Sequence, residues 1–210
     1  MKLMKKLLSI VILPCMLFSL LLSGCSTDEL QSVKREKVSG IADLIFSDDG
    51  LVPNGELTWN MGTEEFLNRV YGAETMIPGD ESFDEQRYFY SEEQNVSTYN
   101  PPVVYRVKGM EADAEVIYAF DESGLYMAGY SWTFDKEDQE KAEKCIELLA
   151  DELNSDPHIV PTAVEQPDLS QLEGALQYSK WSVADAKEQS VELSVLSHLN
   201  TISVTLTIKA

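Results

Sequence analysis

Residues 114–134, AEVIYAFDESGLYMAGYSWTF, decide the fold of this chain. Apolar residues alternate with more polar neighbours over the first seven positions, Ala114–Phe120, which is typical of a strand with one buried face. The turn sequence Asp121-Glu122-Ser123-Gly124 follows, and a second strand is expected over Leu125–Phe134. Two strands joined by so short a turn pair antiparallel. The stretch therefore predicts a β-hairpin.

A helix is predicted directly after the hairpin. Asp135 can cap it, and the periodicity continues from about Lys136 to Leu153. Its apolar residues fall on one side of the helix, and they are Ala142, Cys145, Ile146, Leu149 and Leu153. Such a stripe has to be buried against a sheet or another helix. The hairpin that precedes it is the nearest candidate.

The same order of elements occurs earlier in the chain. Residues 63–72, TEEFLNRVYG, combine a Thr cap, two acids in the first turn, an apolar stripe and a final Gly, which predicts a helix. Expected strands are Arg87–Ser91 and Val103–Lys108 before the hairpin, and Leu176–Val183, Ser190–Leu196 and Thr201–Lys209 after it. We therefore predict an α+β fold, an antiparallel sheet with helices packed on one face, built as two helix-plus-sheet halves over residues 41–134 and 135–210.

The helix at residues 63–72 also carries a resemblance. It is similar to the helix motif of the small lipoprotein in the outer-membrane β-barrel assembly machinery, and Thr63, Leu67 and Gly72 match the motif positions. The β-lactamase inhibitor protein looks like a tandem of the same helix-plus-sheet unit. The resemblance implies only an architecture of two similar units. It gives no indication of an activity.

The first 24 residues have the features of an export signal. Lys2, Lys5 and Lys6 precede an apolar stretch from Leu7 to Leu22 that contains Pro14. A stable transmembrane helix needs roughly 20 apolar residues, so a permanent span is the weaker interpretation. We expect residues 1–24 to be a cleaved signal peptide.

The leader ends in Leu22-Ser23-Gly24-Cys25, which resembles the lipobox of bacterial lipoproteins. The resemblance implies cleavage after Gly24 and a diacylglyceryl thioether on Cys25. Two acyl chains are enough for stable attachment. The expectation is a protein anchored to the bacterial membrane through Cys25 and facing outside the cytoplasm, with residues 25–40 as lipidated cysteine and polar spacer. A short helix centred on the KREK sequence at 34–37 is an equally good interpretation of part of this segment.

Composition limits the possible partners and chemistry. The chain of 210 residues has 36 Asp and Glu against 16 Lys and Arg, a net charge of −20, which disfavours nucleic acid as a partner. Cys15 lies in the leader and Cys25 takes the lipid, so Cys145 is the only thiol left and an intramolecular disulfide is not expected. Metal or other cofactors are not expected, because the acidic segments at 48–50 and 80–85 lack the order of a calcium-binding loop.

Catalytic motifs are scarce in the sequence. The only two histidines, His158 and His198, fall in expected turns, and Cys145 sits on the apolar stripe of a helix. The favoured hypothesis is a non-catalytic lipoprotein that binds an envelope protein or assists envelope assembly. The alternative is an extracytoplasmic hydrolase that cleaves glycan or peptide through two carboxylates. Capture of a small ligand is a third possibility without a sequence feature of its own.

The strand Leu125–Phe134 offers the candidate binding residues. Alternation puts a row of aromatic side chains on one face of the strand. The candidate binding residues in this row are those that carry a hydroxyl or an indole N–H, namely Tyr126, Tyr130 and Trp132. Exposed Tyr and Trp are common at the energetic centre of interfaces. The helix that follows needs an apolar partner, however, and the aromatic face is the richest one available. Core packing is therefore favoured over an exposed recognition surface.

Overall fold

The structure is a computed structural model that describes residues 33–47, 50–55, 57–71, 88–92, 95–160, 168–169, 172, 174–184 and 186–210. About half of these residues lie in strands and a quarter in helices. Within these ranges, no helix has the length and apolar composition that crossing a membrane requires.

The central hairpin is confirmed as β7 (Ala114–Asp121) and β8 (Gly124–Asp135). Its turn depends on Gly124, which has a φ of +107°, and a Cβ there would lie 2.5 Å from the carbonyl oxygen of Asn60. The close approach lets the Asn60 N–H donate to the Leu125 carbonyl, and the Leu125 N–H donate to the Met61 carbonyl, both at 2.9 Å. These contacts fix the segment just before the helix Thr63–Tyr71 against the hairpin.

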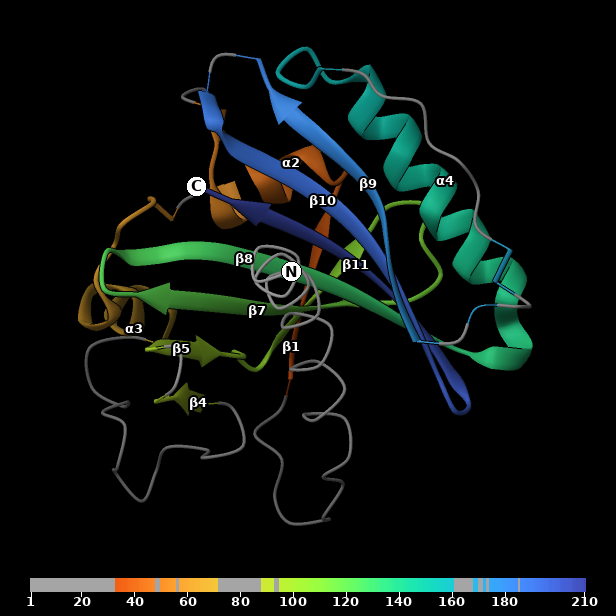
Figure 1. Cartoon of the computed structure of the whole chain (residues 1–210), viewed down its shortest axis with the longest axis horizontal. Coiled ribbons are helices and arrows are strands. Elements are labelled where there is room, and N and C mark those ends of the chain that lie inside the picture. The colour runs from red at the N-terminus through yellow and green to blue at the C-terminus, as the bar shows by residue number, and fades with distance from the viewer. Residues whose placement is uncertain are drawn as a thin grey trace, which may run out of the picture.

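Strands are added on both sides of the hairpin to give one sheet of nine strands (Figure 1). On one side, β8 pairs with β11 (Thr201–Lys209), followed by β10 (Ala186–His198) and β9 (Gly174–Val183). On the other side, β7 pairs with both β6 (Val103–Val107) and β5 (Val96–Tyr99). The sheet ends there in β1 (Lys34–Val38) beside β6, and in β4 (Tyr88–Ser91) beside β5. A separate pair joins β2 (Phe46–Ser47) to β3 (Gly50–Leu51).

The predicted α+β class is wrong. β1 pairs with β6 in parallel, so the large sheet is mixed rather than antiparallel, and three helices accompany it in the described residues. The sequence analysis did not predict β1 and β5, and it divided the strands between two halves. In the structure, β8 and β11 pair along nine residues, so one sheet includes strands from both parts of the chain. The fold is β-rich, and in the described residues it has one large mixed sheet beside the small β2–β3 pair.

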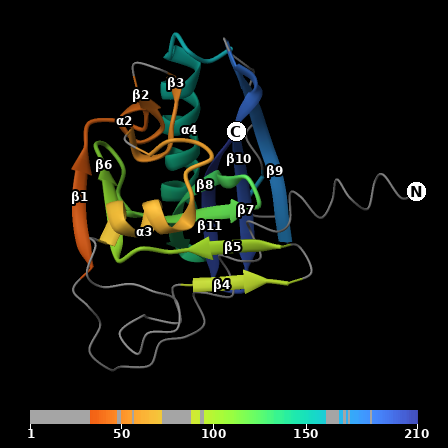
Figure 2. The same cartoon turned by 90° about the vertical axis from the view of Figure 1, so that its left-hand side faces the viewer.

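Three helices contribute to one hydrophobic core. They are α2 (Ala42–Ile45), α3 (Thr63–Tyr71) and α4 (Gln139–Ser155), with short 3₁₀ turns η1 (Pro53–Gly55) and η3 (Lys136–Asp138). The predicted helices around 63–71 and 136–153 are confirmed. The apolar stripe of α4 is buried, and this helix packs against β8 and β11. Figure 2 shows α4 running beside the strongly twisted sheet.

The opposite face of the central strands is polar but largely buried. Ser131 and Thr205 are each 2% exposed, and their hydroxyl oxygens are 3.1 Å apart. The hydroxyl groups of Thr133 and Ser203 also pair across β8 and β11. Small hydroxyl side chains therefore satisfy one another on this face, while the large apolar side chains fill the helix-covered face.

Candidate functional site

The most prominent polar features lie along β1, a strand within the segment that the sequence analysis assigned to the spacer. β1 is an edge strand, and its five residues are KREKV. Their side chains alternate, so Lys34 and Glu36 lie on one side of the strand and Arg35 and Lys37 on the other. The alternation of charges gives no hydrophobic signal, which explains why sequence patterning missed this strand.

A groove of about 750 Å³ lies along β1 on the side of Lys34 and Glu36. Its walls come from β1, β6, α3 and the segment around η1. Charged side chains and aromatic or proline side chains share the lining, among them Lys34, Glu36, Asp43, Arg69, Pro101, Pro102, Tyr105 and Tyr118. A lining that combines charged side chains with aromatic and proline side chains is compatible with a binding site.

The charges around the groove are engaged with local partners. Lys34 and Glu36 form an ion pair of 2.6 Å, and Arg69 pairs with Glu65 at 3.0 Å along α3. The Asp43 carboxylate accepts a hydrogen bond of 2.8 Å from the Ser39 N–H. Exposed pairs of this kind contribute little to stability, so they can rearrange when a ligand enters.

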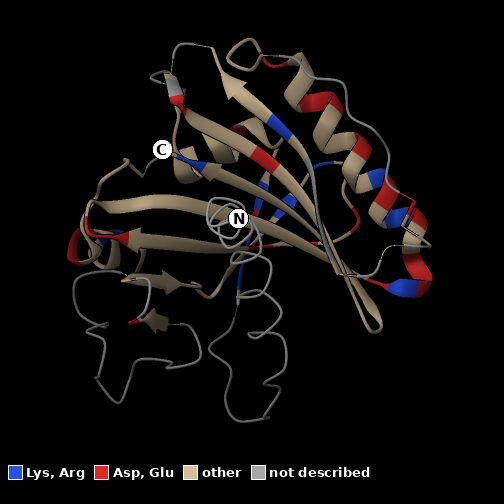
Figure 3. Ribbon diagram, in the orientation of Figure 1, with Lys and Arg blue, Asp and Glu red and all other residues tan. Residues whose placement is uncertain are grey.

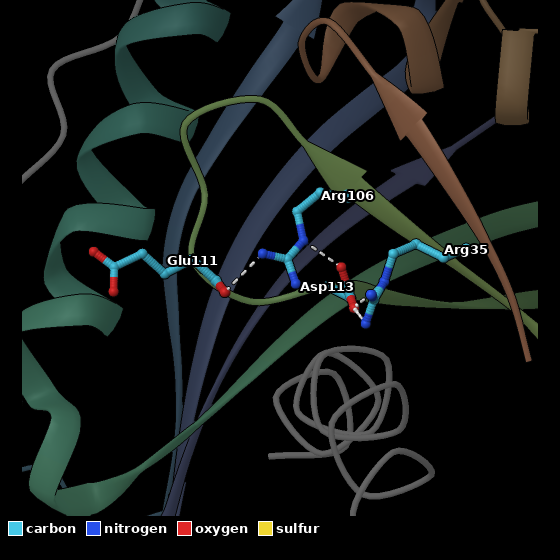
Figure 4. Close-up of polar contacts among 4 residues, drawn as sticks. All are labelled: Arg35, Arg106, Glu111 and Asp113. Carbon is cyan, nitrogen blue, oxygen red and sulfur yellow. Dashed lines mark hydrogen bonds and ion pairs between the residues drawn. The ribbon is translucent and has the colours of Figure 1, made fainter.

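On its opposite side, β1 takes part in a cluster of two arginines around one carboxylate (Figure 4). Arg35 on β1 lies 2.6 Å from one oxygen of Asp113, and Arg106 on β6 binds the other oxygen. Arg106 also donates a 3.0 Å hydrogen bond to the Glu111 carbonyl. The hydrogen bond from Arg106 is the main reason that the pKa of Asp113 is lowered, with Arg35 adding to it. Asp113 is therefore ionised, and it neutralises only one of the two guanidinium groups.

The outer edge of β1 is open in the described part of the chain. The Lys34 N–H donates to the Pro102 carbonyl, and the Val38 carbonyl accepts from the Lys108 N–H. In a parallel ladder these bonds mean that residues 34, 36 and 38 bond to β6, and that the backbone groups of Arg35 and Lys37 point away from it. No described residue hydrogen-bonds to those outward groups.

The aromatic row of β8 lies elsewhere. Tyr130 and Trp132 are 0% exposed in the main core. The Tyr130 hydroxyl donates to the Leu44 carbonyl and accepts from the Asn54 N–H, each at 2.9 Å. Neither side chain can contact a partner while the protein is folded. Both therefore belong to the core, which is the interpretation favoured from the sequence.

Tyr126 is separated from that row by a bulge. The register of β7 and β8 shifts between Ala119 and Phe120, where Tyr126 has no opposing residue. Tyr126 is partly buried against a small cluster of Val96, Ala119 and Met127 instead of the main core. Strict alternation fails at this position because a bulge inserts one extra residue.

Several other predicted features lie outside the described residues. These are the leader, Cys25, most of the spacer, and the acidic segments at 48–49 and 80–85. The structure describes Cys145 as 3% exposed, and burial raises the pKa of its thiol. His158 lies in a turn against Asp156 and stacks on Phe46, and His198 ends β10.

Two described carboxyl groups, Asp113 and Glu192, are unsuited to act as the general acid of a hydrolase. A general acid needs a raised carboxyl pKa. The basic side chains beside Asp113 and Glu192 lower the pKa values of both groups. The described residues also hold no cluster of three or more His, Cys, Asp or Glu suited to a metal ion.

Comparison with known proteins adds no assignment to this geometry. The chain was compared with protein-family models, with curated proteins and with solved structures, and none of the three comparisons found a match.

Proposed function

We propose that this protein is a lipid-anchored extracytoplasmic module that binds an envelope protein without catalysis. The groove beside β1 carries the proposal, because it offers both volume and varied chemistry. The LSGC sequence at 22–25 supports the anchor, and the short distance in sequence from Cys25 to β1 would keep the groove within reach of such an anchor.

The lining of the groove favours a polypeptide segment as ligand. Lys34 and Arg69 can pair with acidic side chains, and Glu36 and Asp43 with basic ones. Pro101 and Pro102 give an apolar wall. An extended segment lying along β1 can also bond to the outward backbone groups of Arg35 and Lys37, a common mode of peptide recognition.

The anchor is tested by metabolic labelling with an acyl-chain probe. The wild-type chain should incorporate the probe, and the Cys25→Ser variant should not. Equal labelling of the two chains would contradict an anchor at Cys25.

The groove is tested by site-specific photo-crosslinking in intact cells. A photoreactive residue in place of Glu36 should give a discrete crosslinked protein, whereas the same residue in place of Asp151 on the far side of α4 should not. Combining the Glu36 probe with Arg69→Ala and Lys34→Ala should weaken the crosslink. A crosslink that forms equally from both positions, or that ignores the groove substitutions, would exclude the groove as the binding site.

A hydrolase remains the second candidate, because the carboxylates of Glu36 and Asp43 both line the groove. Cleavage of cell-wall glycan or peptide by the purified protein, abolished by Glu36→Gln or Asp43→Asn, would establish it. Without such cleavage the binding function stands.

A further inference from the structure

The basic cluster at β1 lies next to the expected membrane anchor. Only eight residues, Ser26 to Val33, separate Cys25 from the start of β1. Eight residues span at most about 28 Å when fully extended. If Cys25 is acylated, Arg35 and Lys37 are therefore held within a few nanometres of the bilayer surface.

The charges on this side of β1 differ in sign from those of the protein as a whole. The register of β1 on β6 puts Arg35, Lys37 and Arg106 on one face of this edge. Figure 4 shows Asp113 between the two arginines. The Arg35 side chain is 59% exposed and that of Arg106 is 34% exposed, and Lys37 is exposed. Even with Glu115 of β7 counted on this face, the cluster keeps a surplus of positive charge, in a chain of net charge −20.

Helix α4, which packs on the other face of the sheet, carries the opposite charge. The outer face of α4 exposes Glu140, Glu147 and Asp151, and Figure 3 shows acidic residues along most of this helix. At physiological ionic strength, charges further apart than about 8 Å are largely screened from each other. The charge nearest to a membrane therefore matters more than the net charge of the protein.

We infer that the cluster of Arg35, Lys37 and Arg106 binds anionic lipid headgroups and holds β1 against the membrane that anchors Cys25. The acidic helix α4 then faces away from the bilayer. Each basic residue close to an anionic surface favours contact by about five-fold. The inference rests on the anchor of the proposed function, but not on the identity of any protein partner.

The orientation can be measured on the acylated mature protein reconstituted into vesicles. A fluorophore is attached through Ser39→Cys, at the end of β1, or through Glu147→Cys on α4, and a headgroup-labelled lipid acts as quencher. Cys25 is acylated and Cys145 is 3% exposed, so the introduced thiol is the reactive one. We expect strong quenching of the Ser39→Cys label in vesicles containing phosphatidylglycerol, weak quenching in pure phosphatidylcholine, and weak quenching of the Glu147→Cys label in both.

Two charge variants make the measurement decisive. Arg35→Gln with Lys37→Gln should lower the equilibrium constant for lying on anionic vesicles by about twenty-five-fold. The matched control Lys136→Gln with Lys141→Gln removes the same charge from exposed positions on η3 and α4 and should change little. Equal quenching in both lipids, or equal effects of the two double variants, would overturn the inference.

Flotation separates failure of the anchor from failure of the orientation. A wild-type protein that floats with neither type of vesicle lacks the anchor, which would contradict this inference together with the anchor. A protein that floats with both but shows no lipid-dependent quenching keeps its anchor and contradicts the orientation alone. Thermal melting of each variant confirms that it is folded.

Discussion

Trp132 is a residue for which the sequence left both a core and a surface position open, and the structure buries it in the core. The side chain is 0% exposed on β8, and its indole N–H has no hydrogen-bond partner among the described residues. Trp132→Ala should lower the free energy of unfolding by about 3–5 kcal/mol, because it leaves a cavity in the core. Trp132→Phe should cost less, since it keeps part of the ring volume and removes an unpaired donor. Urea denaturation measures both, and an unchanged midpoint for Trp132→Ala would contradict its core position.

Glu192 links stability to pH through two lysines. Its carboxylate lies 3.0 Å from Lys180 and 2.8 Å from Lys209, on three adjacent strands. Burial alone would raise the pKa of Glu192, but the two lysines outweigh burial and lower it below the ordinary 4.5. A folded pKa below the unfolded one adds stability that is present above pH 4.5 and is lost as the pH falls through the folded pKa.

The corresponding experiment follows the urea midpoint as the pH falls from about 6 to about 3. The wild type should lose stability more steeply at the acid end than Glu192→Gln, because the variant lacks the ionised partner of both lysines. Glu147→Gln, at an exposed position on α4, serves as the control and should follow the wild type. Parallel curves for all three proteins would show that the lysine pairs contribute nothing.

At the scale of elements, β1 can be tested through its two kinds of backbone position. The N–H of Glu36 is expected to bond to β6, whereas that of Lys37 points to the open edge. Proline removes the N–H and is tolerated on an edge strand only where that group faces solvent. Glu36→Pro should therefore lower the melting temperature clearly more than Lys37→Pro. Equal losses would contradict the register of β1 on β6.

Local patterns predicted most individual elements, because each has its own sequence signal. The β7–β8 hairpin, α3, α4 and the last three strands follow from alternation, caps and turns. β1 and β5 have no such signal: KREKV is almost entirely charged, and Val96–Tyr99 is too short for a periodicity to show. The strand conformation of β1 depends on pairing with β6, which is distant in sequence. That of β5 depends on pairing with β7, from which β6 separates it in the chain.

The candidate site was missed for the same reason. The groove needs β1, α3 and the segment around η1 to meet, and only the folded sheet brings them together. The sequence indicated instead the aromatic row of β8, where Tyr130 and Trp132 are buried in the core. The bulge that moves Tyr126 out of that row also lacks a sequence signal.

At the scale of the whole molecule, the continuity of the sheet predicts cooperative unfolding. The last strands belong to the same sheet as the earlier ones, because β11 pairs with β8 over nine residues, from Thr201 with Asp135 to Lys209 with Met127. Helix α4 also packs on β8 and β11 together, and its Glu152 accepts a 3.1 Å hydrogen bond from the N–H of Ala42, the first residue of α2. Breaking either half exposes the apolar face of the other.

We therefore expect a single unfolding transition, with equal calorimetric and van't Hoff enthalpies, rather than two transitions from independent halves. The fragment 135–210, expressed alone, should lack a cooperative transition, because its α4 and β11 would lose β8 as their common neighbour. Calorimetry of the mature chain with Cys25→Ser avoids the lipid, and circular dichroism follows the fragment. Two resolved transitions, or a fragment that melts cooperatively by itself, would show that residues 41–134 and 135–210 fold as separate units after all, within one shared sheet.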